Sequence, residues 1–106
     1  MREWEGGAWE KELESLTGGS LLYIHTPLCG TCALARRMLG VVEAMMPDLP
    51  LHAANLNRMP GLAERLKVES VPCLSIKDKR TGEWSNLYRF GSVVELNEVI
   101  RRSQQG

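Results

Sequence analysis

The sequence predicts an α/β fold in which helices flank a central, mixed sheet of four strands, as a three-layer sandwich. Segments with apolar residues at helical spacing alternate with short apolar runs, an order that favours parallel strands. The last two strand-like segments are separated only by a turn, which adds an antiparallel pair. The chain has 106 residues, the size of one compact domain, so we expect a single domain over residues 1–106.

The first half of the chain alternates helix, strand and helix. Apolar residues at helical spacing predict a helix over residues 8–16, which the two glycines at 18–19 end. The run "LLYIH" at 21–25 predicts a buried strand, which the following Thr-Pro ends. A long amphipathic helix is expected from residue 32 to about residue 46. Its predicted apolar face consists of Leu34, Met38, Val41 or Val42, and Met45.

The second half predicts a strand, a short helix, a hairpin and a last helix. The segment 51–56 has a weak strand pattern, and Pro-Gly introduces a short helix that ends near residue 67. The segment 70–77 predicts a strand with a proline near its start, where strands tolerate one. The turn "DKRTG" connects it to a second strand at 83–90. The last helix is expected to follow Gly-Ser, with an apolar face of Val94, Leu96, Val99 and Ile100.

Composition and charge exclude several classes of partner. Thirteen basic residues balance thirteen acidic ones, so the chain lacks the basic surface that binds nucleic acid. No apolar run approaches the roughly 20 residues that a membrane span needs. The acidic N-terminus, including Glu3, lacks the apolar core of a signal peptide and is interpreted as a solvated helix face. We therefore expect a cytoplasmic monomer without nucleic-acid or membrane partners.

Two cysteines lie two residues apart where a predicted strand meets a predicted helix. Cys29 and Cys32 have three possible interpretations. They could form a redox dithiol, provide half of a metal site, or be two small buried hydrophobic residues. A zinc site needs four nitrogen or sulfur ligands, commonly as two pairs. Cys73, His25 and His52 are the other candidates, and their spacing forms no second pair. We therefore expect no metal and no organic cofactor.

The position of the pair favours redox chemistry. A helix N-terminus carries roughly half a positive charge and lowers the pKa of a thiol from about 8.5 toward ~3.5–7.5. Cys29, at this N-terminus, is the expected nucleophile, which forms a mixed disulfide with a substrate. Cys32, one turn further and less exposed, is expected to resolve that disulfide. Gly30 and Thr31 between them are small and leave Cys29 accessible.

The motifs "TPLCGTC", "SVPC" and "RFGS", in this order and over nearly the whole chain, resemble the thioredoxin-like family. The resemblance implies a cis-proline at Val71-Pro72 that faces the dithiol, with Val71 hydrogen-bonding the backbone of a bound peptide. It implies that Gly91 lines the substrate groove. The implied activity is a thiol–disulfide oxidoreductase that reduces protein disulfides. Its electrons would come from a disulfide reductase or a low-molecular-weight thiol.

The chain also departs from thioredoxin at four positions near the dithiol. Tyr23, a poor base, replaces a buried aspartate, and Leu28 replaces a tryptophan, which changes the docking surface. His25 is interpreted as a modulator that lowers the pKa of Cys29 or shuttles protons, or as a strand-end histidine without a role. Thr31 replaces proline, and its hydroxyl near Cys32 is expected to stabilise the thiolate and make the pair more oxidising.

Cys73 follows the expected cis-proline directly. Alternation along a strand turns Cys73 away from the dithiol if Pro72 faces it, so we interpret Cys73 as a small buried hydrophobic residue. The alternative is a third thiol that takes glutathione or forms a second disulfide. Two alternative functions also stay open, namely zinc or iron–sulfur binding and a redox-inactive thioredoxin-like interaction module.

Overall fold

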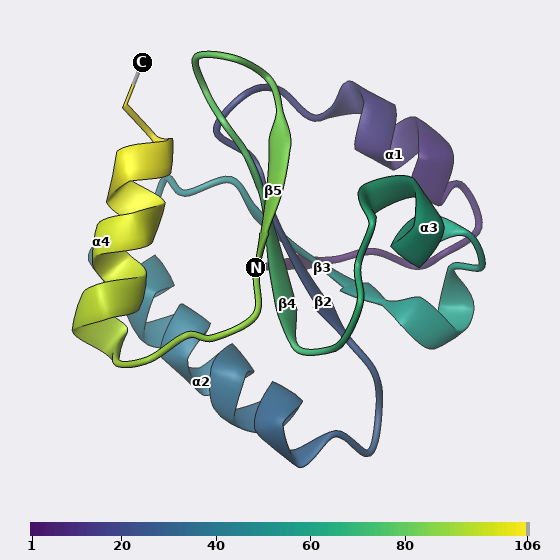
Figure 1. Cartoon of the computed structure of the whole chain (residues 1–106), viewed down its shortest axis with the longest axis horizontal. Coiled ribbons are helices and arrows are strands. Elements are labelled where there is room, and N and C mark those ends of the chain that lie inside the picture. Colours follow the sequence, from purple (N-terminus) through teal and green to yellow (C-terminus); the bar gives the residue numbers. More distant parts are fainter. Residues whose placement is uncertain (106) are drawn as a thin grey trace.

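The fold is described from a computed structural model, which places residues 1–105. Ten elements follow one another along the chain (Figure 1). They are β1 (Arg2–Glu3), α1 (Trp9–Ser15), β2 (Leu21–His25), α2 (Gly30–Met45), β3 (Leu51–Asn55), the 3-10 helix η1 (Leu56–Arg58), α3 (Leu62–Leu66), β4 (Cys73–Lys77), β5 (Trp84–Leu87) and α4 (Val93–Ser103).

The strands form one mixed sheet in the order β1-β3-β2-β4-β5. β3 pairs in parallel with both β1 and β2, whereas β4 pairs antiparallel with β2 and with β5. The predicted fold class and terminal hairpin are confirmed. The sheet has five strands instead of the expected four, because β1 adds an edge. A two-residue strand carries no recognisable periodicity, so its sequence gives no signal.

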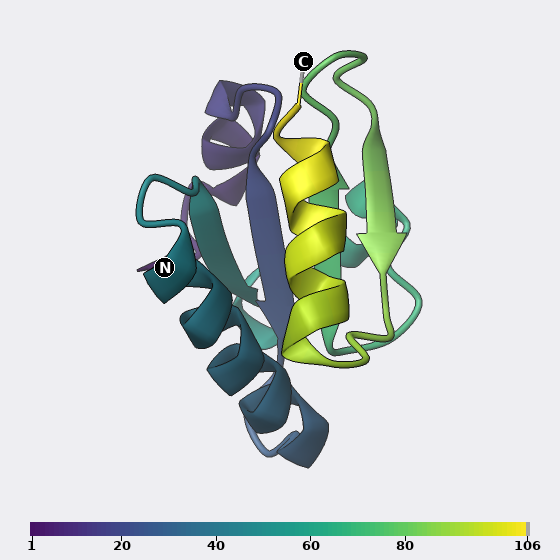
Figure 2. The same ribbon diagram turned by 90° about the vertical axis from the view of Figure 1, so that its left-hand side faces the viewer.

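Helices cover both faces of the sheet, with α2 and α4 on one side and α1 and α3 on the other (Figures 1 and 2). Alternation along β2 divides the core between the two faces. Leu21 and Tyr23 pack in the cluster under α2 and α4, and Leu22 and Ile24 pack in the cluster with α1 and α3. Among the described residues, no helix combines the length and apolar character needed to cross a bilayer.

The apolar face predicted for α2 is only partly correct. Cys32, Ala35, Leu39 and Val42 are the buried residues of this helix. Of the predicted face, Val42 is buried and Met38 packs against the core, whereas Leu34, Val41 and Met45 are 52%, 48% and 53% exposed. Both sets have helical spacing, so periodicity alone cannot choose between them. In α4, Leu96 and Ile100 are buried as expected, whereas Val94 is exposed and Val99 lies at the boundary.

The loops that carry the predicted site meet at one end of the sandwich. The connection from β2 to α2, the segment before β4 and the segment before α4 lie together at the lower end of the molecule in Figure 1. The fold therefore brings Cys29, Pro72 and Gly91 to the same end, although they are far apart in the sequence.

Candidate active site

Cys29 and Cys32 form a disulfide at the start of α2, with their Cα atoms 5.1 Å apart. Cys29 is the N-cap residue, and its sulfur accepts a hydrogen bond of 3.2 Å from the backbone N–H of Cys32. Cys29 is partly exposed, whereas Cys32 is only 4% exposed. The free N–H groups of the first helical turn stabilise negative charge at the N-cap sulfur. The geometry thus gives one accessible and one buried sulfur.

The hydroxyl of Thr31 lies 3.5 Å from the sulfur of Cys29. The expectation that this hydroxyl stabilises Cys32 is wrong, because Thr31 is exposed on the first turn while Cys32 packs into the core. The side chain therefore reaches the surface sulfur. Any stabilisation of a thiolate by Thr31 acts on Cys29.

A shallow groove of about 350 Å³ lies beside the dithiol. It joins three of the predicted substrate-binding residues, Thr31, Pro72 and Gly91. The Val71–Pro72 peptide bond is cis, as the resemblance implies, and Val71 packs on both core clusters. The remaining lining is apolar or aromatic and consists of Leu34, Ala35, Met38, Tyr88 and Phe90. The groove can accommodate an extended chain with apolar side chains.

Leu28 precedes the disulfide with a fully exposed side chain and a backbone φ of +59°. A residue other than glycine in this left-handed region carries a strain of about 1–2 kcal/mol. The strained backbone presents an apolar side chain to solvent next to Cys29. Gly30, the first residue of α2, is also exposed, and a Cβ at this position would meet no neighbour within 4 Å.

A second pocket, of about 290 Å³, is lined by both cysteines and by Tyr23, His25 and Arg36. Tyr23 is fully buried and donates a hydrogen bond to the backbone carbonyl of Cys32. Its ring stacks on that of His25, with centroids 5.2 Å apart and an interplanar angle of 15°. Burial raises the pKa of the Tyr23 phenol, which keeps it a neutral donor.

Glu3 of β1 bonds to two of the residues that line this pocket, His25 and Arg36. Its Oε2 lies 2.9 Å from Nε2 of His25, and its Oε1 lies 2.8 Å from Nη2 of Arg36. Burial alone would raise the pKa of Glu3, but the hydrogen bonds with His25 and Arg36 outweigh it and lower the pKa. The guanidinium of Arg36 also lies 5.3 Å from the centroid of the Tyr23 ring.

We compared the chain with known proteins. It matches no protein-family model. It is 45% identical over 83 residues to the thioredoxin-like protein YusE of Bacillus subtilis (strain 168), and the match covers 77% of this chain and 76% of that protein. The chain belongs to the thioredoxin-like family.

Solved thioredoxin structures share the fold. The reduced form of thioredoxin 2 from Pseudomonas aeruginosa PAO1 aligns with a TM-score of 0.77 at 23% identity, over 97% of this chain and 94% of that chain. The thioredoxin of Fasciola hepatica aligns with a TM-score of 0.76 at 18% identity, over 98% of this chain and 100% of that chain. With its Cys29–Cys32 disulfide, this thioredoxin-like chain is a thiol–disulfide oxidoreductase.

The alternative functions are not favoured. Among residues 1–105, no three His, Cys, Asp or Glu side chains are grouped so that they could hold a metal ion. Cys73 is fully buried in the cluster with α1 and α3, away from the dithiol. Burial raises the pKa of its thiol to about 11, and Ser75 is 3.8 Å away. His52 lies on another part of the sheet, where Nε1 of Trp4 donates a hydrogen bond of 3.2 Å to its Nδ1.

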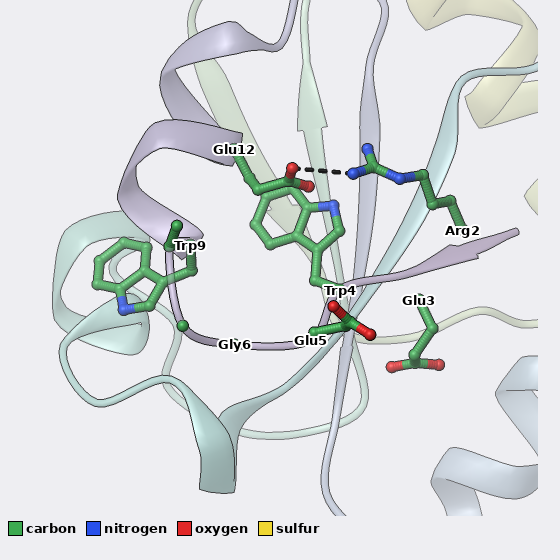
Figure 3. A pocket seen from close by; sticks show the side chains of 9 residues that line it. Arg2, Glu3, Trp4, Glu5, Gly6, Trp9 and Glu12 are labelled. Atoms are coloured by element: carbon green, nitrogen blue, oxygen red, sulfur yellow. Dashed lines mark hydrogen bonds and ion pairs between the residues drawn. The ribbon is translucent and has the colours of Figure 1, made fainter.

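The roles of Glu3 and Arg36 have no signal in the sequence. Charge patterning places Glu3 on a solvated helix face, but Glu3 lies on β1 and Arg36 of α2 is bonded to it. Figure 3 shows that the side chain of Glu3, on β1, and that of Trp4, the next residue, point in opposite directions. Trp4 turns into another pocket, of about 480 Å³, near the ion pair of Arg2 and Glu12. Since none of the predicted site residues lines that pocket, we do not assign it to the redox site.

Proposed function

We propose that the chain reduces disulfides of protein substrates, with Cys29 as the attacking thiol and Cys32 as the resolving thiol. The observation that carries the proposal is the division of the pair into an accessible N-cap sulfur and a buried one. The N-cap position favours the thiolate at Cys29, and burial protects Cys32 from competing partners.

The reaction transfers two electrons from the dithiol to the substrate. The Cys29 thiolate attacks one sulfur of the substrate disulfide, which forms a mixed disulfide and releases one substrate thiolate. Cys32 then loses its proton and attacks the sulfur of Cys29. The Cys29–Cys32 disulfide forms, the second substrate thiolate leaves, and protons from the dithiol or solvent neutralise both products.

The groove beside the dithiol is the proposed docking site. An extended peptide would lie along Thr31, Pro72 and Gly91, and the backbone of Val71 would pair with it as one rung of a transient strand. The apolar lining supports a preference for apolar residues next to the substrate cysteine. Leu28 and Gly30 would flank the attacked sulfur.

We place this activity in the cytoplasm, where a disulfide reductase or a low-molecular-weight thiol would return the pair to the dithiol. We further propose that the domain over residues 1–106 acts as a monomer. Neither a metal nor an organic cofactor takes part in the proposed reaction.

Replacing single cysteines tests these roles, with reduction of insulin by the pre-reduced protein as the assay. We expect Cys29→Ser to abolish reduction. We expect Cys32→Ser to accumulate a mixed disulfide between Cys29 and the substrate, which mass spectrometry detects. Cys73→Ser is the matched control and should retain the parent rate. A Cys29→Ser variant that reduces insulin at the parent rate would contradict the proposal.

A further inference from the structure

The resolving step requires a group that takes the proton of a buried thiol. Burial disfavours the thiolate, so Cys32 attacks slowly unless a base accepts its proton. The charged and titratable groups around the second pocket are Tyr23 and His25 on β2, Glu3 on β1, and Arg36 on α2, besides Cys29 itself.

Three of these groups are unsuitable as the acceptor. Tyr23 already donates its hydroxyl proton to the Cys32 carbonyl, and burial raises its pKa, so the phenol has no basic oxygen to offer. Arg36 stays protonated in proteins. The carboxylate of Glu3 is bonded to both Arg36 and His25, and its lowered pKa makes it a weak base. The imidazole of His25 remains, and a neutral imidazole can accept a proton as a general base.

The hydrogen bonds of His25 favour one tautomer. Nε2 lies 2.9 Å from Oε2 of Glu3, an ionised carboxylate that can only accept, and 3.2 Å from Nη2 of Arg36, which can only donate. The shorter contact with the carboxylate favours the proton on Nε2, while Nη2 donates to Oε1 of Glu3 at 2.8 Å. In this tautomer Nδ1 is the unprotonated nitrogen, and among residues 1–105 it has no hydrogen-bond partner.

The second pocket connects the side chain of His25 to the dithiol. His25 and Cys32 line the same space of about 290 Å³, whereas a water molecule occupies about 30 Å³. Water in the pocket can therefore connect the two side chains. The Tyr23 ring, stacked on His25 and bonded to the Cys32 backbone, fixes their relative position.

We propose that His25, held by Glu3, accepts the proton of Cys32 through water in this pocket when the mixed disulfide is resolved. This inference rests on the proposed function. The proton moves from the Cys32 sulfur to Nδ1, and the imidazolium that forms is paired with the Glu3 carboxylate. The Cys32 sulfur bonds to Cys29, the bond between Cys29 and the substrate breaks, and the leaving thiolate takes a proton from the imidazolium or solvent. Glu3 is a positioning residue.

Stopped-flow reaction of the reduced protein with excess 5,5′-dithiobis(2-nitrobenzoate) separates the two steps. Attack by Cys29 releases the first coloured thiolate at a rate that depends on reagent concentration. Resolution by Cys32 releases the second coloured thiolate at a rate that does not depend on reagent concentration. We expect His25→Gln to leave the first phase unchanged and to slow the second about tenfold at pH 7, a modest effect for a general base.

The pH profile distinguishes proton transfer from a structural role. In the parent, the rate of the second phase should rise with pH through an inflection that reports loss of the proton from the acceptor. In His25→Gln that inflection should disappear, and the deficit should shrink as the pH rises, because a growing share of the Cys32 thiol then ionises without a base. Glu3→Gln, on the exposed edge strand, should move the inflection to lower pH and slow the second phase less. His52→Asn is the control and should match the parent throughout.

Each outcome decides the inference. A second phase that is unchanged in His25→Gln, or slowed equally at every pH, would overturn the role of His25 while leaving the proposed function intact. If His25→Gln does not fold, an unchanged inflection in Glu3→Gln would overturn the inference instead. Absence of the first phase in the parent would overturn the proposed function, and this inference with it.

Discussion

Leu28 combines a strained backbone with a side chain that contributes nothing to the core. Asparagine adopts the left-handed region more readily than leucine, so Leu28→Asn should keep or raise the free energy of unfolding, by at most about 1 kcal/mol. The same change should lower kcat/KM for a protein disulfide several-fold, because an apolar contact beside Cys29 is lost. Urea unfolding and insulin reduction measure the two effects.

Val41→Asn is a suitable control for this prediction, since Val41 is also exposed but lies further along α2. It should leave kcat/KM unchanged. A Leu28→Asn variant that is destabilised by more than about 1 kcal/mol, or that reduces insulin at the parent rate, would contradict the account of Leu28.

Cys73 should make the stability of the fold depend on pH under alkaline conditions. Its pKa is raised from 9.0 to about 11 in the folded state. Between these values the unfolded chain loses the thiol proton while the folded chain keeps it, so ionisation favours unfolding. Stability is therefore fully present below about pH 9 and declines as pH rises to about 11, by about 2–3 kcal/mol in total.

Urea unfolding of the oxidised protein at about pH 8, 9, 10 and 11 measures this decline. Cys73→Ala, which lacks the thiol, should show a smaller decline over the same range, so that the difference between the two curves isolates Cys73. If the stabilities of the parent and of Cys73→Ala declined equally with pH, the Cys73 thiol would have the same pKa in the folded and the unfolded chain, which would contradict this prediction.

Helix α2 is the element where sequence and structure differ most. If Leu39 belongs to the buried face, Leu39→Ala should lower the free energy of unfolding by about 2–5 kcal/mol. Val41, one of the two valines that periodicity allowed on the buried face, is exposed, and Val41→Ala should change stability by less than about 0.5 kcal/mol. Chemical denaturation of both variants checks this. Similar losses of unfolding free energy in the two variants would contradict the burial of Leu39 and the exposure of Val41.

The other elements show which signals a sequence carries. Most strands and helices were predictable because each of these segments has its own local sequence pattern. The apolar run at 21–25, for example, forms β2. The N-cap position of Cys29 and the capping of α4 by Ser92 follow from equally local patterns. The two residues of β1 have no such pattern, and they form a strand only because β3 provides a partner.

At the scale of the whole molecule, the dithiol and its groove were predictable because their motifs are contiguous. The network of Glu3, His25 and Arg36 was not, because it joins three elements through pairings that arise only in the folded chain. Residue Glu3 reaches the site because β1 lies parallel to β3, which in turn lies beside β2. Charge patterning along the sequence therefore placed Glu3 on a solvated helix face.

The measurement that tests the account most directly is a redox titration of the purified protein in glutathione buffers. Free thiols are trapped by alkylation at each potential and mapped by mass spectrometry. We expect one reversible two-electron transition that joins Cys29 to Cys32, with Cys73 remaining a thiol throughout. Failure of Cys29 and Cys32 to form a reversible disulfide at any potential would contradict the assignment of this pair as the redox centre.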